Sequence, residues 1–283
     1  MIKFGMAGKS NILEKCDIRE VADYCFKIGL DLFEYPIVHG LPIHHEVIAQ
    51  NVKSAFDGKN IALSVHAPYY TNFSNPDPAK IESTMGYVSA ALLFAKEVGS
   101  DRIIVHPGSQ RDLSRSDAMS IALENLAVFG NRIDLQEPNN VYIYLETLGI
   151  IRQMGTVEEI LQMCSIHHKF VPCLDFGHIN SRYCGLLKKE PSNYEDILKL
   201  CKDTLPENKI NRLHIHFSKI IYGNKGERSH TTFADDIYGP DFEPMIDALI
   251  KLNINANIIC ESAGTQDMDA LTMKQYYSSK VYN

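Results

Sequence analysis

Short apolar runs alternate with longer amphipathic stretches along the whole chain. Runs of five or six residues rich in Ile, Val, Leu and Phe predict buried strands, whereas apolar positions three or four apart predict helices. The predicted strands are Ile2–Met6, Leu30–Tyr35, Ile61–His66, Arg102–His106, Val141–Glu146, Phe170–Asp175, Arg212–His216 and Ala256–Glu261. The predicted helices are Ile18–Ile28, His44–Phe56, Pro78–Val98, Arg115–Ile133, Thr156–Cys164, Tyr194–Thr204, Phe242–Leu252 and Ala270–Ser278. The chain is therefore a repeated strand–helix unit.

Eight strand–helix units favour a closed (β/α)8 barrel, the TIM barrel, over an open doubly wound sheet. The length of 283 residues suits this fold, and no linker rich in Pro, Gly or Ser divides the chain. We therefore expect one barrel domain over residues 1–283. No strand precedes a GxGxxG or GxxxxGK[ST] turn, which argues against a dinucleotide site and against a P-loop.

Composition narrows the class of protein. With 45% apolar and 22% charged residues, the chain resembles ordinary globular proteins, and its net charge of −7 argues mildly against non-specific binding to nucleic acid. Seven cysteines without a CxxC pair favour reduced thiols over a disulfide framework. The first residues lack the apolar stretch typical of a signal peptide, and no apolar run approaches the length needed to span a membrane. We expect a cytoplasmic protein with no membrane association and no obligate protein partner.

Six of the eight predicted strands end on a potential metal ligand. These ligands are His66, His106, Glu146, Asp175, His214 and Glu261, and His178 and His230 follow in the loops. The carboxyl ends of barrel strands meet at one mouth, where barrel enzymes place their active sites. Imidazoles with carboxylates are the ligand set of Zn²⁺, with Mn²⁺ or Fe²⁺ as alternatives. The pattern predicts two or three divalent metals per chain, most simply zinc.

Each of these residues also has an ordinary structural interpretation. A lone histidine at a strand end is more often simply hydrogen-bonded, and Asp175 is well placed to cap the next helix. Six charged or polar ligands at the edge of apolar strands are harder to explain in this way, because burying them without partners is costly. His216 shares the orientation of His214 two residues earlier, which indicates a supporting role or a substrate contact.

The segments that carry these ligands resemble the endonuclease IV family of apurinic/apyrimidinic endonucleases, within the wider xylose-isomerase-like barrels. CLDFGH is similar to the family's CLDTCH, and RLHIHFSK to its MHLNDSK-type stretch. The resemblance implies a trinuclear zinc site. His66 and His106 would hold one zinc, and Glu146 would bridge to a second that Asp175, His214 and Glu261 complete. His178 and His230 would hold the third, and Tyr69 would lie near the DNA.

Two departures from the family pattern affect this assignment. The family has an aspartate two residues before its last histidine, and Arg228 occupies that position here, so Glu227, Asp235 or Asp236 would have to substitute. The family's loop after strand 2 penetrates DNA and is rich in arginine. Here PIVHGLPIHH replaces it and contains none. Basic side chains supply much of the affinity for nucleic acid, so the DNA contacts would differ.

Two functions follow from this resemblance. One is metal-assisted hydrolysis of the backbone of double-stranded DNA at abasic sites, with Glu146 bridging metals and Glu261 orienting or deprotonating water. The other is isomerisation or epimerisation of a small sugar, with one metal held by Glu146, Asp175, His214 and Glu261. The extra histidines at 66, 106, 178 and 230 favour the polynuclear hydrolase. A metal-binding barrel without activity is a third interpretation.

Overall fold

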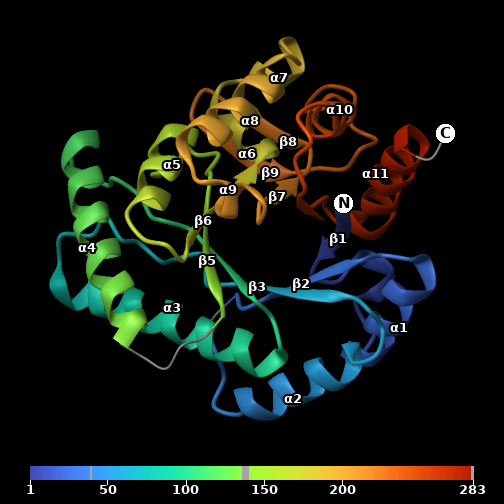
Figure 1. Cartoon of the computed structure of the whole chain (residues 1–283), viewed down its shortest axis with the longest axis horizontal. Helices are drawn as coiled ribbons and strands as arrows, with labels where there is room; N and C mark the ends of the chain where they lie inside the picture. Colours follow the sequence, from blue (N-terminus) through green and yellow to red (C-terminus); the bar gives the residue numbers. More distant parts are fainter. Residues whose placement is uncertain (39, 136–139, 282–283) are drawn as a thin grey trace.

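The computed structural model describes residues 1–38, 40–135 and 140–281. Eight parallel strands close into a barrel in the order β1-β10-β7-β6-β5-β4-β3-β2, which confirms the predicted fold class (Figure 1). The barrel strands are β1 (Lys3–Ala7), β2 (Leu32–Pro36), β3 (Ala62–His66), β4 (Arg102–Val105), β5 (Tyr142–Glu146), β6 (Phe170–Asp175), β7 (His214–Phe217) and β10 (Asn257–Cys260). Each lies within two residues of its predicted bounds.

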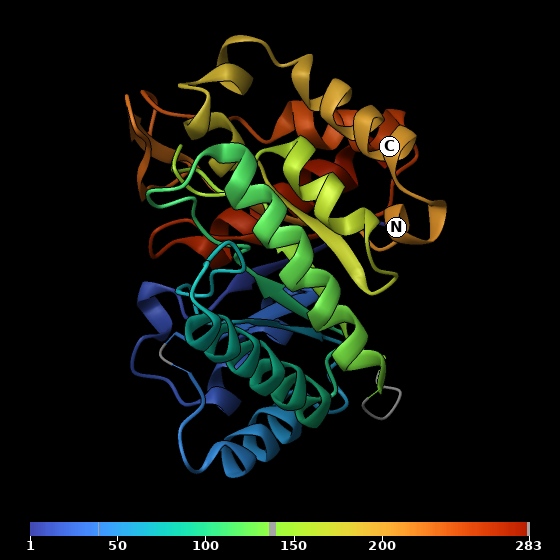
Figure 2. The same ribbon diagram turned by 90° about the vertical axis from the view of Figure 1, so that its left-hand side faces the viewer.

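Helices cover the outside of the barrel (Figures 1 and 2). The longer ones are α1 (Ile18–Ile28), α2 (His45–Phe56), α3 (Pro78–Val98), α4 (Arg115–Leu135), α5 (Val157–Ser165), α8 (Asn193–Thr204), α10 (Glu243–Lys251) and α11 (Gln266–Val281). Local signals set their ends: Asp17 and Glu20 form a capping box that starts α1, and Gly29 ends it in the left-handed conformation. None of the helices in the described ranges has the length and apolar character needed to cross a bilayer.

Further short elements lie in the connections between these units and were not predicted. They are η1 (Asn11–Leu13), α6 (Phe176–Arg182), α7 (Leu186–Lys189), α9 (Glu207–Ile210) and an antiparallel hairpin of β8 (Ile220–Gly223) and β9 (Gly226–His230). The hairpin packs on the loop after β5, where Ile150 and Gly226 form an isolated bridge. The long loop after β7 is thereby attached to the rim of the barrel.

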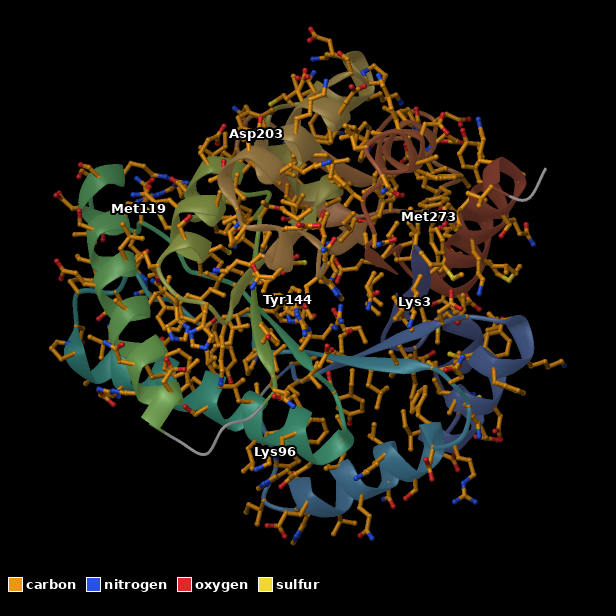
Figure 3. The ribbon with its side chains drawn as sticks, viewed as in Figure 1. Lys3, Lys96, Met119, Tyr144, Asp203 and Met273 are labelled. Atoms are coloured by element: carbon orange, nitrogen blue, oxygen red, sulfur yellow. The ribbon has the colours of Figure 1, made fainter. Side chains whose placement is uncertain are left out.

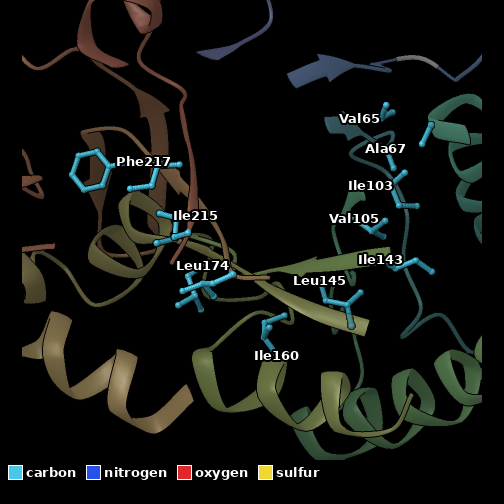
Figure 4. Packing of buried hydrophobic residues seen from close by; sticks show 14 of the residues in the cluster. Val65, Ala67, Ile103, Val105, Ile143, Leu145, Ile160, Leu174, Ile215 and Phe217 are labelled. Carbon is cyan, nitrogen blue, oxygen red and sulfur yellow. The ribbon is translucent and has the colours of Figure 1, made fainter. Parts of the chain in front are cut away.

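The strands sort their side chains by the period of two. Alternate residues such as Val65, Ile103 and Ile143 belong to the main apolar core between the strands and the helices, and Figure 4 shows Leu145 of β5 beside Ile160 of α5. The remaining residues face the barrel interior, where Ile104, Tyr144, Val171 and Cys173 form a separate small cluster. Tyr144 lies among the strands near the middle of the molecule (Figure 3). The strand ends above this cluster form the mouth.

Candidate metal centre

Three predicted ligands from β3, the end of β4 and β5 form one cluster at the mouth, called here the barrel cluster: His66, His106 and Glu146. Glu146 is fully buried, and its Oε2 lies 3.3 Å from His66 Nε2 and 3.0 Å from His106 Nε2. The three residues sit on neighbouring strands, so the barrel itself fixes their spacing. Ligand atoms of all three lie within 4.8 Å of one another.

A second group lies beside the barrel cluster and is called here the hairpin cluster: His178, Glu227 and His230. His178 comes from the first turn of α6, and the other two come from β9. Glu227 Oε2 is 3.3 Å from His178 Nε2, and its Oε1 is 3.7 Å from His230 Nε2. Of the three carboxylates that could substitute at this position, the structure brings Glu227 to the histidines.

An irregularity in the hairpin explains how Glu227 and His230, three residues apart, reach the same cluster. Ile221 pairs with Ser229 and Tyr222 pairs with Glu227, so β9 advances two residues where β8 advances one. This β-bulge accommodates Arg228 as the extra residue and changes the alternation of the strand. Arg228 is exposed, whereas Glu227 is partly buried at the site.

One histidine in each cluster is oriented by a hydrogen bond on its other nitrogen. His66 Nδ1 lies 2.7 Å from the Ala67 carbonyl and His178 Nδ1 lies 2.9 Å from the Thr147 carbonyl. A carbonyl accepts only from a protonated nitrogen, so these contacts place a hydrogen on Nδ1 and leave Nε2 as the nitrogen that faces the carboxylates of the site. Metal-binding histidines are typically held in this way.

Asp175 contacts the hairpin cluster, and Glu261 lies beside His216 of β7. Asp175 Oδ1 accepts a 2.6 Å hydrogen bond from the His178 backbone N–H, so Asp175 does cap α6. Its Oδ2 is buried without any hydrogen-bond partner and lies 3.2 Å from His178 Nδ1. Glu261 follows β10, and its Oε1 lies 3.5 Å from His216 Nδ1. Asp175 therefore combines the structural role with an unsatisfied atom at the site.

The two histidines of β7 are placed opposite to the expectation. His216 is paired in register with Asp175, and its Nδ1 lies 3.0 Å from Glu146 Oε1. His214 is paired with Cys173, one step deeper, where its Nδ1 accepts a 3.4 Å contact from Arg102 and its Nε2 lies 3.3 Å from Glu34. Both histidines point inward, but only His216 reaches the level of the mouth.

Burial and charge act against each other on the groups of the mouth. Burial disfavours ionisation of Glu146, but His216 and His106 hold the pKa of its carboxyl well below the usual range. Burial also disfavours the charged form of His178, yet Asp175 and Glu227 raise its pKa well above the ordinary value. Glu261 differs from Glu146, because burial outweighs its cationic neighbours and raises its pKa. Glu261 therefore accepts a proton more readily than Glu146.

The mouth opens into a cavity of about 470 Å³. The barrel cluster, the hairpin cluster and Glu261 all contribute to its lining, together with Tyr69. The Tyr69 ring centroid is 4.8 Å from that of His66, and its side chain is 48% exposed, so the ring forms part of the cavity wall while remaining open to solvent. Burial, followed by the nearby Glu261, raises the pKa of Tyr69, so its hydroxyl stays protonated near neutral pH.

The donor set fits divalent metals. Ligands bound at about 2.0–2.1 Å to one tetrahedral zinc lie roughly 3.3 Å apart. The N···O separations of 3.0 and 3.3 Å in the barrel cluster are close to this value, as is the 3.3 Å between His178 and Glu227. The buried Asp175 Oδ2, which lacks a hydrogen-bond partner, is a further donor that a cation would satisfy.

Glu34 of β2 was missed by sequence reasoning. Its side chain is 1% exposed and points into the barrel, 3.0 Å from His216 Nε2. His216 and His214 hold its pKa well below the usual range although burial opposes this. The available signal was a single carboxylate inside the apolar run LFEYP, where a charge needs a buried partner.

Comparison with known proteins gives the same fold. A family model described as a xylose isomerase-like TIM barrel matches residues 22–275. An uncharacterised protein of Methanocaldococcus jannaschii is 28% identical over 98% of this chain and 97% of its own length. A protein of Streptomyces avermitilis named as a probable endonuclease 4 is 25% identical over 68% of this chain and 62% of its own length.

Solved structures resemble the chain over nearly its whole length. A D-tagatose 3-epimerase-like protein superposes with a TM-score of 0.72 at 18% identity, covering 99% of this chain and 100% of its own. Endonuclease IV from Thermus thermophilus gives 0.67 at 15% identity, covering 98% of this chain and 99% of its own. At these identities the likeness shows the fold alone, because one barrel supports many chemistries.

Proposed function

Because the chain belongs to the xylose isomerase-like TIM barrel family, we propose that it is a metal-dependent phosphodiesterase that cleaves the DNA backbone at abasic sites. The observation that carries the proposal is the pair of adjacent ligand clusters in one cavity. Glu146 belongs to the barrel cluster and also lies 3.4 Å from His178 of the hairpin cluster. A second cluster is expected for a polynuclear hydrolase and is not needed by an enzyme that uses one metal.

The ligands divide into three sets, two of which share Glu146. His66, His106 and Glu146 would hold one ion, and His178, Glu227 and His230 would hold another. Glu146, Asp175, His216 and Glu261 would hold the ion between them, with His216 in the place first expected for His214. The nitrogen-rich donor set favours zinc, with Mn²⁺ or Fe²⁺ as alternatives.

The residues of the mouth would divide the chemistry among them. Clustered divalent ions, when bound, neutralise phosphate charge and acidify water near neutral pH. Glu261 lines the cavity, and its raised pKa suits a group that orients and deprotonates the attacking water. Glu146, buried among four histidines, would hold the ions together. Tyr69 would contact a nucleotide turned out of the duplex toward the cavity.

Relatives named as probable endonuclease 4 support DNA as the substrate. In this chain the loop after β2 lacks arginine. The protein would therefore bind the DNA backbone through groups other than the arginines that the family uses there. Abasic DNA is the partner expected from the ligand clusters, and no membrane contact is required.

A sugar epimerase is the second candidate. The central set of Glu146, Asp175, His216 and Glu261 would hold a single metal beside a carbonyl substrate without help from the hairpin cluster. Solved epimerase structures also superpose closely, including one of D-psicose 3-epimerase with D-tagatose at a TM-score of 0.69. This candidate leaves the hairpin cluster without a role.

A nicking assay separates the two candidates. The protein, purified without chelator, is incubated with a duplex that carries one abasic site, with an undamaged duplex of the same sequence, and with D-tagatose. We expect cleavage of the abasic strand that a strong chelator abolishes. Glu261→Gln should lower the rate by about 10²–10⁴ and keep duplex binding. Turnover of D-tagatose without cleavage of the abasic duplex would refute the nuclease and favour the epimerase.

A further inference from the structure

Glu34 is a buried carboxylate inside the barrel, one step below the mouth. It faces the interior from the middle of β2 and is paired in register with Ser64 of β3. Barrel interiors are usually filled with branched apolar side chains, and an ionised group there is costly unless it is paired. The contacts of Glu34 therefore indicate what its charge does.

The two oxygens of Glu34 have different surroundings. Oε2 accepts a 2.7 Å hydrogen bond from Ser64 Oγ and lies 3.3 Å from His214 Nε2. Oε1 lies 3.0 Å from His216 Nε2, close enough for an ion pair, and neither of these two atoms has a hydrogen-bond partner in the described part of the chain. Oε2 is thus held by Ser64 within the barrel, whereas Oε1 faces His216, the histidine of β7 that lies at the mouth.

His216 connects Glu34 to the proposed metal ligands. While Nε2 faces Glu34, Nδ1 lies 3.0 Å from Glu146 and 3.5 Å from Glu261. An imidazole that binds a metal through one nitrogen commonly donates the other N–H to a carboxylate or carbonyl, which fixes the tautomer and strengthens the ligand. For His66 and His178 that outer group is a neutral backbone carbonyl.

We propose that Glu34 is a positioning residue that holds His216 with Nδ1 directed at the metal centre and supplies a negative charge behind the ring. The inference rests on the proposed metal centre and deepens it. It assigns the metal-binding nitrogen of His216 as Nδ1, whereas His66 and His178 would use Nε2.

His214 does not join Glu34 to the proposed metal ligands. Its Nδ1 accepts from Arg102, which leaves the hydrogen on Nε2, directed at Glu34 Oε2. His214 and Ser64 thus act on the same oxygen of Glu34 and leave Oε1 to His216.

The test compares metal affinity in wild type, Glu34→Gln and Ser64→Ala. Each metal-free protein is titrated with Co²⁺ against a competing chelator, and the visible spectrum of bound Co²⁺ is recorded. Glu34→Gln keeps the shape of the side chain and removes its charge. The Co²⁺ ion held by His216 should therefore bind about 10–100-fold more weakly, with a changed visible spectrum. Ser64→Ala disturbs the anchored oxygen alone and should retain both the affinity and the spectrum.

A double-mutant cycle separates positioning from a general effect on the core. In a His216→Ala background, Glu34→Gln should cause no additional loss of Co²⁺ affinity, because its action passes through His216. An equal loss in both backgrounds would overturn the proposal. If Glu34→Gln does not fold, Glu34→Asp keeps the charge but shortens its reach, and it should also weaken Co²⁺ binding.

The possible failures are distinct. Wild-type affinity in Glu34→Gln or in a folded Glu34→Asp would refute the role of Glu34 and leave the proposed function untouched. Absence of Co²⁺ binding in the wild-type protein would refute the metal centre itself, and the role of Glu34 with it.

Discussion

The barrel cluster and the hairpin cluster contain the same residue types but are built differently. His66, His106 and Glu146 lie on or directly after adjacent barrel strands, where the hydrogen-bonded sheet fixes their separation. The hairpin cluster combines the first turn of α6 with a bulged strand that packs on another loop. The barrel cluster therefore depends on the fold as a whole, and the hairpin cluster depends on a few local contacts.

This contrast bears on how one barrel supports different chemistries. In the proposed arrangement the central set of four ligands would hold one metal, and the hairpin cluster would add a further site without changing the barrel. Substitutions in the hairpin should remove the additional metal selectively, whereas substitutions in the barrel cluster should affect all of them. The predictions below use that difference.

The largest effect is expected for Glu146→Gln. Glu146 lies within 3.4 Å of His66, His106, His178 and His216, so its loss removes a ligand from two of the proposed metal positions and a negative charge from beside the third. Bound metal and cleavage of the abasic duplex should both fall to background. Glu158→Gln, an exposed change in the first turn of α5, is the control for both measurements. Full activity in Glu146→Gln would contradict a shared ligand.

A selective effect is expected for Glu227→Gln. The variant should lose one metal per chain and about 10–100-fold in affinity at that position, because Glu227 is the carboxylate between His178 and His230. The barrel cluster should keep its metal. Arg228→Gln alters the exposed neighbour and should leave metal content unchanged, as measured by elemental analysis. Equal metal loss in the two variants would show that Glu227 is not the ligand.

A smaller, indirect effect is expected for Gly226→Ala. Gly226 has φ +90°, and a Cβ there would collide with the Gly149 carbonyl on the loop after β5. The strain costs about 1–3 kcal/mol and should shift the hairpin, which weakens its metal first. Gly58→Ala, with φ +71° and no atom within 4 Å of the added Cβ, has the backbone strain without the collision. Thermal unfolding of both variants is measured with and without metal, and the gain in Tm on adding metal should be smaller for Gly226→Ala than for Gly58→Ala. An equal gain in the two variants would argue against the packing of the hairpin on the loop after β5.

The smallest effect is expected for a substitution of Glu159, which supports the loop after β5. Burial opposes ionisation, but hydrogen bonds from Arg115 and from the Thr156 and Gly155 backbone lower the pKa of Glu159. A lowered pKa in the folded state contributes stability above the unfolded value of about 4.3, and this is lost as pH falls through the folded value. Glu159→Gln should therefore lower Tm by a few degrees at pH 7, and the difference from wild type should shrink below pH 4. A difference that stays constant across this range would mean that the charge of Glu159 contributes nothing.

Much of the fold was predictable because each unit carries its own signals. Short apolar runs located all eight barrel strands, and the ends of α1 and α3 coincide with Asp17, Gly29, Asp77 and Gly99. The members of the barrel cluster were predicted for the same reason, since the ends of parallel strands must meet at one mouth.

The remaining features depend on relations that one sequence does not display. The choice between His214 and His216 depends on the register of β7 against β6, because the period of two directs both rings inward. Glu227 reaches His178 through a bulge, and no residue pattern in GNKGERSH distinguished it from Asp235 or Asp236. Glu34 was overlooked because its partners lie on distant strands.

The most direct test of the central claim is the number of metal ions per chain in wild-type protein purified without chelator. Elemental analysis should find two or three, with zinc as the expected element, because the two clusters provide separate ligand sets at one mouth. A single ion per chain, or none, would contradict a polynuclear centre.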